Sequence, residues 1–413
     1  MTDDEIIELA EAAAGTGNNA WMLISTALVL FMVPGLALFY GGMVRSKNML
    51  NMLNMNTYCL GIVPLLWVVF TYSLGNNGSG DGFPGAWIGN FDLAGLDGLT
   101  GDSDALITVA FLMTFAVITP ALISGAVADR MKFAAWAVFV PVWSILVYTP
   151  VTYWVYTGWH TDLNPHALDF AGGTAIHINA GIAALAVVLV LGKRKGWPTT
   201  SMPPHNLPFV MLGAGILWFG WFGFNAGSAF AADGAAVQAL LNTFIAASAG
   251  MITWLLVEKI RDGHATTLGG ASGVVAGLVA ITPAAGFVGG LSPIIFGAAA
   301  SVCCYFAIQL KGKYGYDDSL DVVGVHMVGG IVGGLLLGFF ADARIGDQDG
   351  LFFGEAGLVV SQVIAMASVI VFSFVVTYII AKVLDATIGL RVSEEDEQSG
   401  LDHTQHAETA YVD

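Results

Sequence analysis

Charge is scarce in this sequence. Only 11% of its 413 residues are charged, while 56% are hydrophobic and the mean hydropathy is +0.73. A soluble protein of this size carries about 25% charged residues. The shortage therefore excludes an ordinary soluble protein and indicates a polytopic membrane protein with one membrane domain.

Basic residues are the scarcest of the charged types. Lysine and arginine total 14 against 31 aspartate and glutamate residues, which gives a net charge of −17. This balance argues against nucleic-acid binding, which needs basic patches. The acidic amino terminus also lacks the basic region of a signal peptide. A halophilic origin is a hypothesis from this composition, and full activity and stability in dilute buffer would contradict it.

Cysteine is nearly absent, and charge is missing from the apolar runs. Cys59, Cys303 and Cys304 all lie in apolar runs without CxxC spacing, so neither a metal site nor redox chemistry is indicated. The runs contain no lysine, arginine or glutamate, which a fixed-charge pump or a voltage sensor would need. We therefore expect a mostly apolar pathway and no cofactor.

Long uncharged runs predict the membrane helices. One run, 265–310, is too long for a single crossing and is split at ITPAAGFVGG. The other runs cover 20–44, 57–75, 105–128, 133–157, 170–192, 207–232, 235–257, 322–341 and 356–381. The predicted fold is all-α, with eleven transmembrane helices.

The basic residues orient these helices. Thirteen of the fourteen lysines and arginines fall on one side of the predicted membrane, and Arg344 alone falls on the other. The positive-inside rule makes the thirteen-residue side cytoplasmic. We therefore predict an extracellular acidic amino terminus, 1–19, a membrane transport domain, 20–386, and a cytoplasmic carboxyl-terminal tail, 387–413.

An internal repeat divides the membrane domain. HINAGIAAL at 177–185 and HMVGGIVGGL at 326–335 share a His-x-x-small-Gly-Ile pattern. Because the copies lie in the fifth and the tenth predicted helix, an odd offset of five, the second must be inverted. The prediction is therefore two inverted five-helix repeats, about 20–192 and 207–341, followed by a last helix at about 355–386. Asp169 would then lie on the outer side and Asp321 on the inner side.

Two histidines lie inside the uncharged runs. In an inverted repeat, His177 and His326 would face each other near the midplane, although two unrelated core imidazoles are the alternative. A neutral imidazole offers one donor and one acceptor, so a facing pair can share a proton. This lining suits a small neutral molecule better than a bare ion.

Longer motifs resemble a known family. AWMLISTALVLFMVPGLALFYGGMVRSKN, DFAGGTAIHINAGIAAL, HNLPFV, GWFGFNAGSA and DVVGVHMVGGIVGG are similar to segments of the ammonium transporter (Amt/Rh) family, Amt branch. The matches run from residue 20 to about 341, and IGLRVSEEDEQSGLD resembles the tail of that branch. The resemblance implies an eleven-helix homotrimer with one path for ammonium, ammonia or methylammonium in each subunit.

The resemblance also assigns roles to single residues. It makes His177 and His326 the twin histidines of the path, Phe115 and Phe224 its outer gate, and Trp221 a pore-lining residue. It places Phe111, Ser228 and Asp169 at an outer ammonium-recruitment site, with Asp169 mainly structural. It makes Asp321 the structural aspartate of the tenth helix. These residues are expected to conduct, not to catalyse.

Two positions depart from the family pattern. Counting along YTPVTYWVYTGWH places Tyr156 where the family's outer site has a tryptophan, with Trp154 or Trp159 as alternatives. Tyrosine is a weaker cation–π partner than tryptophan. Met327 stands after His326, where the family usually has glycine, and its bulk is expected to narrow the path.

Three functions follow from these observations. The first is a plasma-membrane transporter or channel that captures ammonium, deprotonates it and conducts ammonia with or without the proton. The second is an ammonium sensor that signals through a cytoplasmic PII protein, which the resemblance allows to dock on the inner face and tail. The third, an enzyme that uses the histidines as metal ligands, is disfavoured because no third ligand accompanies them on their helices.

Overall fold

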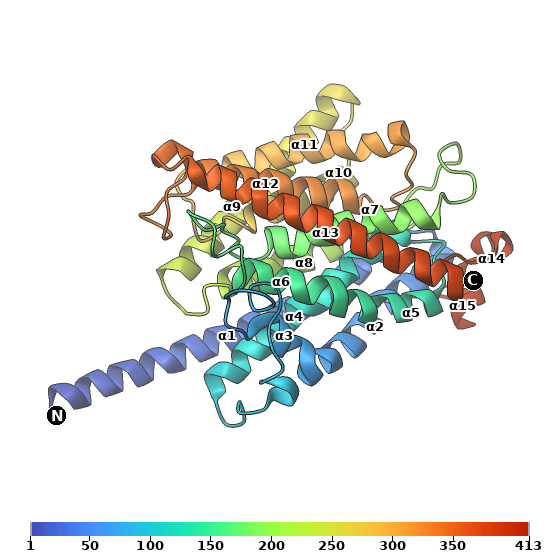
Figure 1. The fold of residues 1–413 in the computed structure, drawn as a ribbon. Helices are drawn as coiled ribbons and strands as arrows, with labels where there is room; N and C mark the ends of the chain where they lie inside the picture. The colour runs from blue at the N-terminus through green and yellow to red at the C-terminus, as the bar shows by residue number, and fades with distance from the viewer. Residues whose placement is uncertain (1, 412–413) are drawn as a thin grey trace.

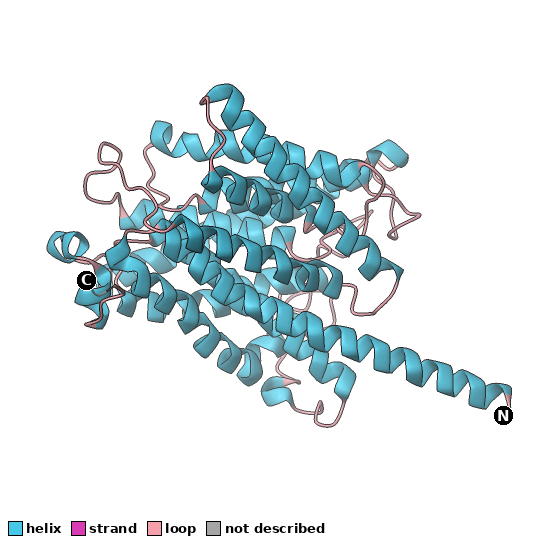
Figure 2. Cartoon of the chain, turned by 180° about the vertical axis from the view of Figure 1, so that it is seen from behind, coloured by secondary structure: helices cyan, strands magenta, loops and turns pink. Residues whose placement is uncertain are grey.

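The apolar runs form long helices. The computed structural model describes residues 2–411, and within them ten helices are long and apolar enough to cross a bilayer. An eleventh apolar helix, α10 (Thr267–Ile281), is shorter. Figure 2 shows helices and loops without strands in the described chain. The predicted all-α fold with eleven apolar helices is confirmed.

In chain order the other helices are α1 (Asp3–Met43), α2 (Met49–Leu66), α3 (Tyr72–Asn76), α4 (Ser103–Val127), α5 (Phe133–Trp143), α6 (Thr149–Tyr156), α7 (Asn179–Leu191), α8 (Leu207–Gly227), α9 (Gly234–Arg261), α11 (Ser292–Tyr314), α12 (Val328–Phe340), α13 (Gly357–Thr387), α14 (Glu394–Ser399) and α15 (Leu401–His406). The spans α2–α3, α5–α6, α7 and α12 are each extended or interrupted by a π-helical segment.

Two helices begin earlier than hydropathy predicts. Helix α2 starts at Met49, not at 57, because its first turns carry polar side chains that are buried and bonded inside the protein. For example, Asn56 donates to Ser124 Oγ at 3.2 Å. Helix α1 starts at Asp3 behind a Thr2 capping box and projects from the bundle at its amino-terminal end (Figure 1).

Small residues allow the first helices of the two repeats to pack closely. Helix α8 meets α1 through glycines, and a Cβ atom at Gly213 would lie 2.3 Å from the Phe39 backbone nitrogen. A Cβ at Gly220 would lie 2.8 Å from the Leu28 carbonyl oxygen. Dispersion contacts at such short range hold membrane helices together, since lipid tails are as apolar as leucine.

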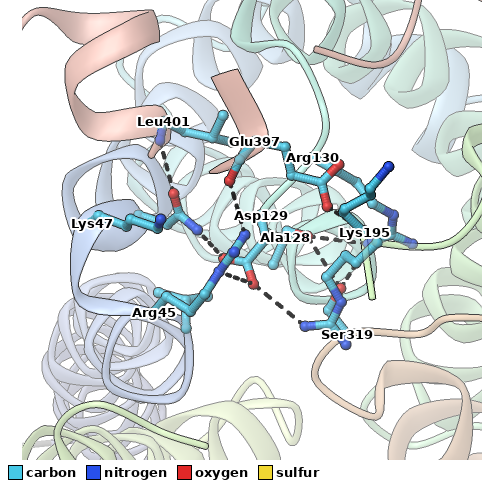
Figure 3. A network of polar contacts seen from close by, with 12 residues as sticks. Arg45, Lys47, Ala128, Asp129, Arg130, Lys195, Ser319, Glu397 and Leu401 are labelled. Atoms are coloured by element: carbon cyan, nitrogen blue, oxygen red, sulfur yellow. Dashed lines mark hydrogen bonds and ion pairs between the residues drawn. The ribbon is translucent and has the colours of Figure 1, made fainter. Parts of the chain in front are cut away.

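The two termini lie at opposite ends of the bundle (Figure 1). We call the end that carries residues 388–411 the tail face and the other end the opposite face. On the tail face, Glu397 is fully buried, and its carboxylate accepts from the Lys195 backbone N–H and from Arg391, both at 2.6 Å. Its backbone carbonyl accepts from Arg45 at 3.3 Å (Figure 3).

The tail also binds the loop between α1 and α2 and the first turn of α2. Asn48 accepts from the Leu401 N–H at 2.8 Å and donates to the buried Asp129. Asp402 accepts from the Asn51 N–H at 2.8 Å. Residues predicted to be a cytoplasmic tail are therefore a folded segment that is hydrogen-bonded to the loops of the first repeat.

A buried ion pair joins the two repeats beneath the tail. Arg194 follows α7, and its guanidinium lies 2.8 Å from the carboxylate of Asp317, which precedes helix α12. The Asp317 side chain is 0% exposed and that of Arg194 is 7% exposed. Asp129 adds a second carboxylate 3.4 Å from Arg194. The buried Arg130 is a second cation beside Asp317, so these buried charges compensate one another as a cluster.

Replacement of Arg194 by Ala is expected to destabilise the protein by about 3 kcal/mol, because the buried Asp317 carboxylate loses both hydrogen bonds from the Arg194 guanidinium and keeps only the Arg130 charge near it. Lys195→Ala is the matched control, since the Lys195–Glu394 pair is 50% and 67% exposed. Such an exposed pair is worth at most about 1 kcal/mol. Unfolding by SDS titration in mixed micelles measures both variants, and equal losses would contradict the assignment.

Candidate functional site

Both intramembrane histidines lie in π-helical segments. His177 is in Gly173–Ile178, which leads into α7, and His326 is in Val323–Met327, which leads into α12. A π-helical turn inserts one extra residue into a helix and occurs often at functional sites. The inverted copies therefore share a local backbone distortion as well as a motif.

Asp169 holds the first of these segments in place. Its Oδ1 accepts from the N–H groups of Gly172 and Gly173 at 3.0 and 2.6 Å, and its Oδ2 from those of Thr174 and Ala175 at 2.9 and 3.0 Å. These are the amides that a helix start leaves without partners. One carboxylate thus satisfies four backbone donors just before the histidine.

The corresponding carboxylate in the second copy is Asp318, which the sequence reasoning missed. Asp318 Oδ2 accepts from the Val323 N–H at 2.7 Å. It stands eight residues before His326, as Asp169 stands eight before His177, and that equal spacing was the available signal. Asp321, the predicted counterpart, instead pairs with Lys311 at 2.5 Å on the tail face. Burial, together with the nearby Asp321, raises the pKa of Asp318 to about 6.

The two histidines meet. His177 Nδ1 and His326 Nδ1 are 3.2 Å apart, and the rings are nearly parallel with centroids 5.3 Å apart. Both side chains are buried. At this distance one neutral ring donates its Nδ1–H and the other accepts. His177 Nε2 has no hydrogen-bond partner within residues 2–411.

Aromatic rings cover this pair. Trp221 stacks on His177 at a centroid distance of 5.4 Å and 16° between planes. Phe115 and Phe224 stack on each other at 4.2 Å and 13°, and the Phe224 ring lies 6.1 Å from that of His177. The predicted gate residues, the tryptophan and the histidines therefore form one continuous aromatic group.

The stacked phenylalanines separate two cavities. A cavity of ≈ 280 Å³ has Phe115, Tyr156, Ser228 and Phe230 among its lining residues. On the other side of the stack, a cavity of ≈ 10 Å³ is lined by Phe224, Trp221 and both histidines, with apolar side chains around them. The second volume is about that of one water-sized molecule.

The predicted recruitment residues divide into two groups. Tyr156 and Ser228 line the larger cavity. Phe111 is fully buried, with its ring 4.8 Å from that of Phe115 and 5.5 Å from that of Phe230. Asp169 lines a separate small cavity. Phe230, which has a positive φ of 55°, was not anticipated from the sequence.

The geometry decides between the candidates for the outer aromatic residue. Trp154 and Trp159 pack against Trp87, with ring centroids 5.4 and 5.6 Å from it, and the Trp154 indole donates to the Trp87 carbonyl at 2.7 Å. Of these three candidates, Tyr156 is the one that lines the larger cavity, together with Tyr148 and Thr152 of the same segment.

Met327 was expected to lie beside the path next to His326, but it packs elsewhere. It packs against Gly181 of α7, where an added Cβ would lie 2.5 Å from the Met327 backbone nitrogen. The residues that line the narrow cavity include His326 but not its neighbour Met327. The missing side chain at Gly181 accommodates Met327, and Met327 does not line the narrow cavity.

Residues 20–411 match a family model described as Ammonium Transporter Family. The chain belongs to this family. It is 49% identical to an ammonium transporter of Mycobacterium bovis, over 96% of this chain and 90% of the relative. It is 50% identical to one from Aquifex aeolicus, over 97% and 95%. The chain is therefore a multi-pass membrane protein of a transporter family, and not an enzyme.

Solved structures agree. The crystal structure of Saccharomyces cerevisiae Mep2 superimposes with a TM-score of 0.85 at 31% identity, over 92% of this transporter and 88% of that chain. A structure entitled "Sensor Amt Protein" gives 0.89 at 25% identity, over 97% and 100%. Similarity in sequence and similarity in structure therefore both support the eleven-helix fold and ammonium transport.

Replacement of Asp169 by Ala is expected to destabilise this transporter by at least about 3 kcal/mol, because four backbone donors lose a charged acceptor. Asp233→Ala is the control, since Asp233 caps α9 through one bond to the Ala236 N–H. A single cap is worth about 0.5–2 kcal/mol. Unfolding free energies of the two purified variants check the comparison, and a loss at Asp169 no larger than at Asp233 would contradict it.

Proposed function

We propose that this chain captures ammonium in the larger cavity, removes a proton at the phenylalanine gate and conducts ammonia past His177 and His326. The observation that carries the proposal is the 3.2 Å contact between two buried imidazoles in an otherwise apolar cavity. The ion is re-formed on the far side. Each further step is supported by a feature of the path.

Capture needs acceptors and aromatic faces. Ser228 Oγ donates its proton to the Phe224 carbonyl at 2.8 Å, so its lone pairs remain free to accept from an ammonium ion. Tyr156 contributes a ring and a hydroxyl to the same cavity. An aromatic face attracts a cation by about 0.5–2 kcal/mol. Asp169 supports capture as the nearby fixed negative charge.

Selection follows from size and desolvation. The Phe115–Phe224 stack closes the larger cavity, and the space beyond it is that of one small molecule. A hydrated cation does not fit, and a bare cation there has no carboxylate to compensate it. Ammonia fits and can bond to imidazole nitrogens, so the ammonium ion must first give its proton to water in the larger cavity.

The direction of the path is proposed from charge. The tail face carries basic residues such as Arg45, Arg130 and Arg194, whereas Arg344 lies in the loop between α12 and α13 and pairs with Asp342. The positive-inside rule makes the tail face cytoplasmic in the plasma membrane. The larger cavity then opens on the outer side of the membrane. From the resemblance to the Amt branch, we also propose a homotrimer with one path in each subunit.

A sensor role is the second candidate, favoured by the similarity to a structure entitled "Sensor Amt Protein". The folded tail on the tail face supplies a surface for a cytoplasmic PII protein. The two candidates differ in flux: a sensor binds ammonium without transporting it. Both roles are compatible with one fold, so measurement of transport separates them.

In proteoliposomes, the wild-type protein is expected to transport ammonium and methylammonium but not potassium. His177→Ala is expected to lower the rate about tenfold or to admit potassium, because it removes one of two polar groups from the narrow cavity. Solid-supported-membrane currents measure whether the proton crosses as well. Unchanged rate and selectivity in His177→Ala would remove the histidine pair from the mechanism, and ammonium binding without flux would favour the sensor.

A further inference from the structure

Trp221 has one polar atom, its indole Nε1–H, and this atom is bound outside the narrow cavity. It donates to Thr282 Oγ1 at 2.9 Å. The Thr282 hydroxyl in turn donates to the Leu278 carbonyl at 2.8 Å. Because its only proton is used there, Thr282 must act as an acceptor towards the indole. The direction of both bonds is therefore fixed.

We propose that Thr282 is a positioning residue that keeps the indole N–H of Trp221 out of the conduction path. The indole then presents its ring to the cavity, and the imidazole nitrogens are the polar atoms that ammonia meets. The proposal rests on the proposed function of His177 and His326. It assigns a task to a fully buried residue at the carboxyl-terminal end of α10.

The stacking geometry shows why the orientation matters. Trp221 lies nearly parallel to His177, with 16° between the rings, and the His177 Nε2 beside it has no partner within residues 2–411. When His177 Nδ1 donates to His326, this Nε2 is a bare acceptor. A released indole N–H is a buried donor without a partner, and such a donor seeks an acceptor. It would compete with ammonia for that nitrogen or tilt the ring.

The protein contains a matched bond away from the path. Trp143 of α5 donates its indole N–H to Thr377 Oγ1 of α13 at 3.0 Å. Both residues are fully buried, as are Trp221 and Thr282. The same threonine-to-valine change can therefore be made twice. One change releases an indole over His177, and the other releases an indole that packs between α5 and α13.

The test is the initial rate of methylammonium uptake by proteoliposomes. Thr282→Val is expected to lower Vmax about fivefold or more, because the orphaned N–H disturbs the narrow cavity. The KM should stay within about twofold, since the recruitment cavity is unaltered. Thr282→Ser restores the acceptor and is expected to restore the rate. Thr377→Val should transport as the wild type does, even where its melting temperature falls.

A double mutant tests whether Thr282 affects transport through the indole of Trp221. Trp221→Phe removes the indole N–H itself, so Thr282→Val should cause no further loss in that background. A similar loss with and without Trp221 would overturn the proposal, as would equal rates for Thr282→Val and Thr377→Val. If Thr282→Val does not reach the membrane, Thr282→Ala is compared with Thr377→Ala by the same criteria.

The two proposals fail in different ways. An unchanged His177→Ala variant rejects the proposed path and, with it, the basis for a role of Thr282. An impaired His177→Ala together with an unaffected Thr282→Val leaves the path intact and rejects the positioning role alone.

Discussion

The hydrogen bonds between Asp169 and four successive backbone amides fix where the histidine pair can form. A helix that starts within the thickness of a membrane protein exposes donors that no water can satisfy. By accepting from them, the carboxylate sets the start of the segment that carries His177, eight residues on. Asp318 occupies the same place before His326. The contact between the imidazoles depends on both starts being fixed.

An extra residue in each segment then turns the histidines towards each other. In a regular α-helix each residue advances about 100° around the axis, so a single insertion rotates all following side chains. Both copies carry this insertion at the histidine. Stacking by Trp221 and closure by Phe115 and Phe224 act on rings whose positions are already determined. The apolar surroundings keep the pair neutral and complete the site.

Hydropathy and the internal repeat were sufficient to predict the number of helices and the pairing of the two histidines. The sequence predicted eleven helices, the split of 265–310 and the meeting of His177 with His326. It did not predict the start of α2 at Met49, because buried asparagines there resemble a loop in composition. The π-helical segments, and the bond from Trp221 to Thr282, depend on tertiary contacts between distant segments. Likewise, only packing separates Tyr156 from Trp154 and Trp159.

The folded tail has a consequence for the order of synthesis. The loops that hold Asn48 and Lys195 obtain their bonds to Leu401 and Glu397 only after nearly the whole chain has left the ribosome. All the membrane helices end by Thr387 and can be inserted before that moment. Insertion and final closure of the tail face are therefore separate events in time. A chain that stops just after α13 would contain both histidines and the rings that cover them but leave the partners of the tail exposed.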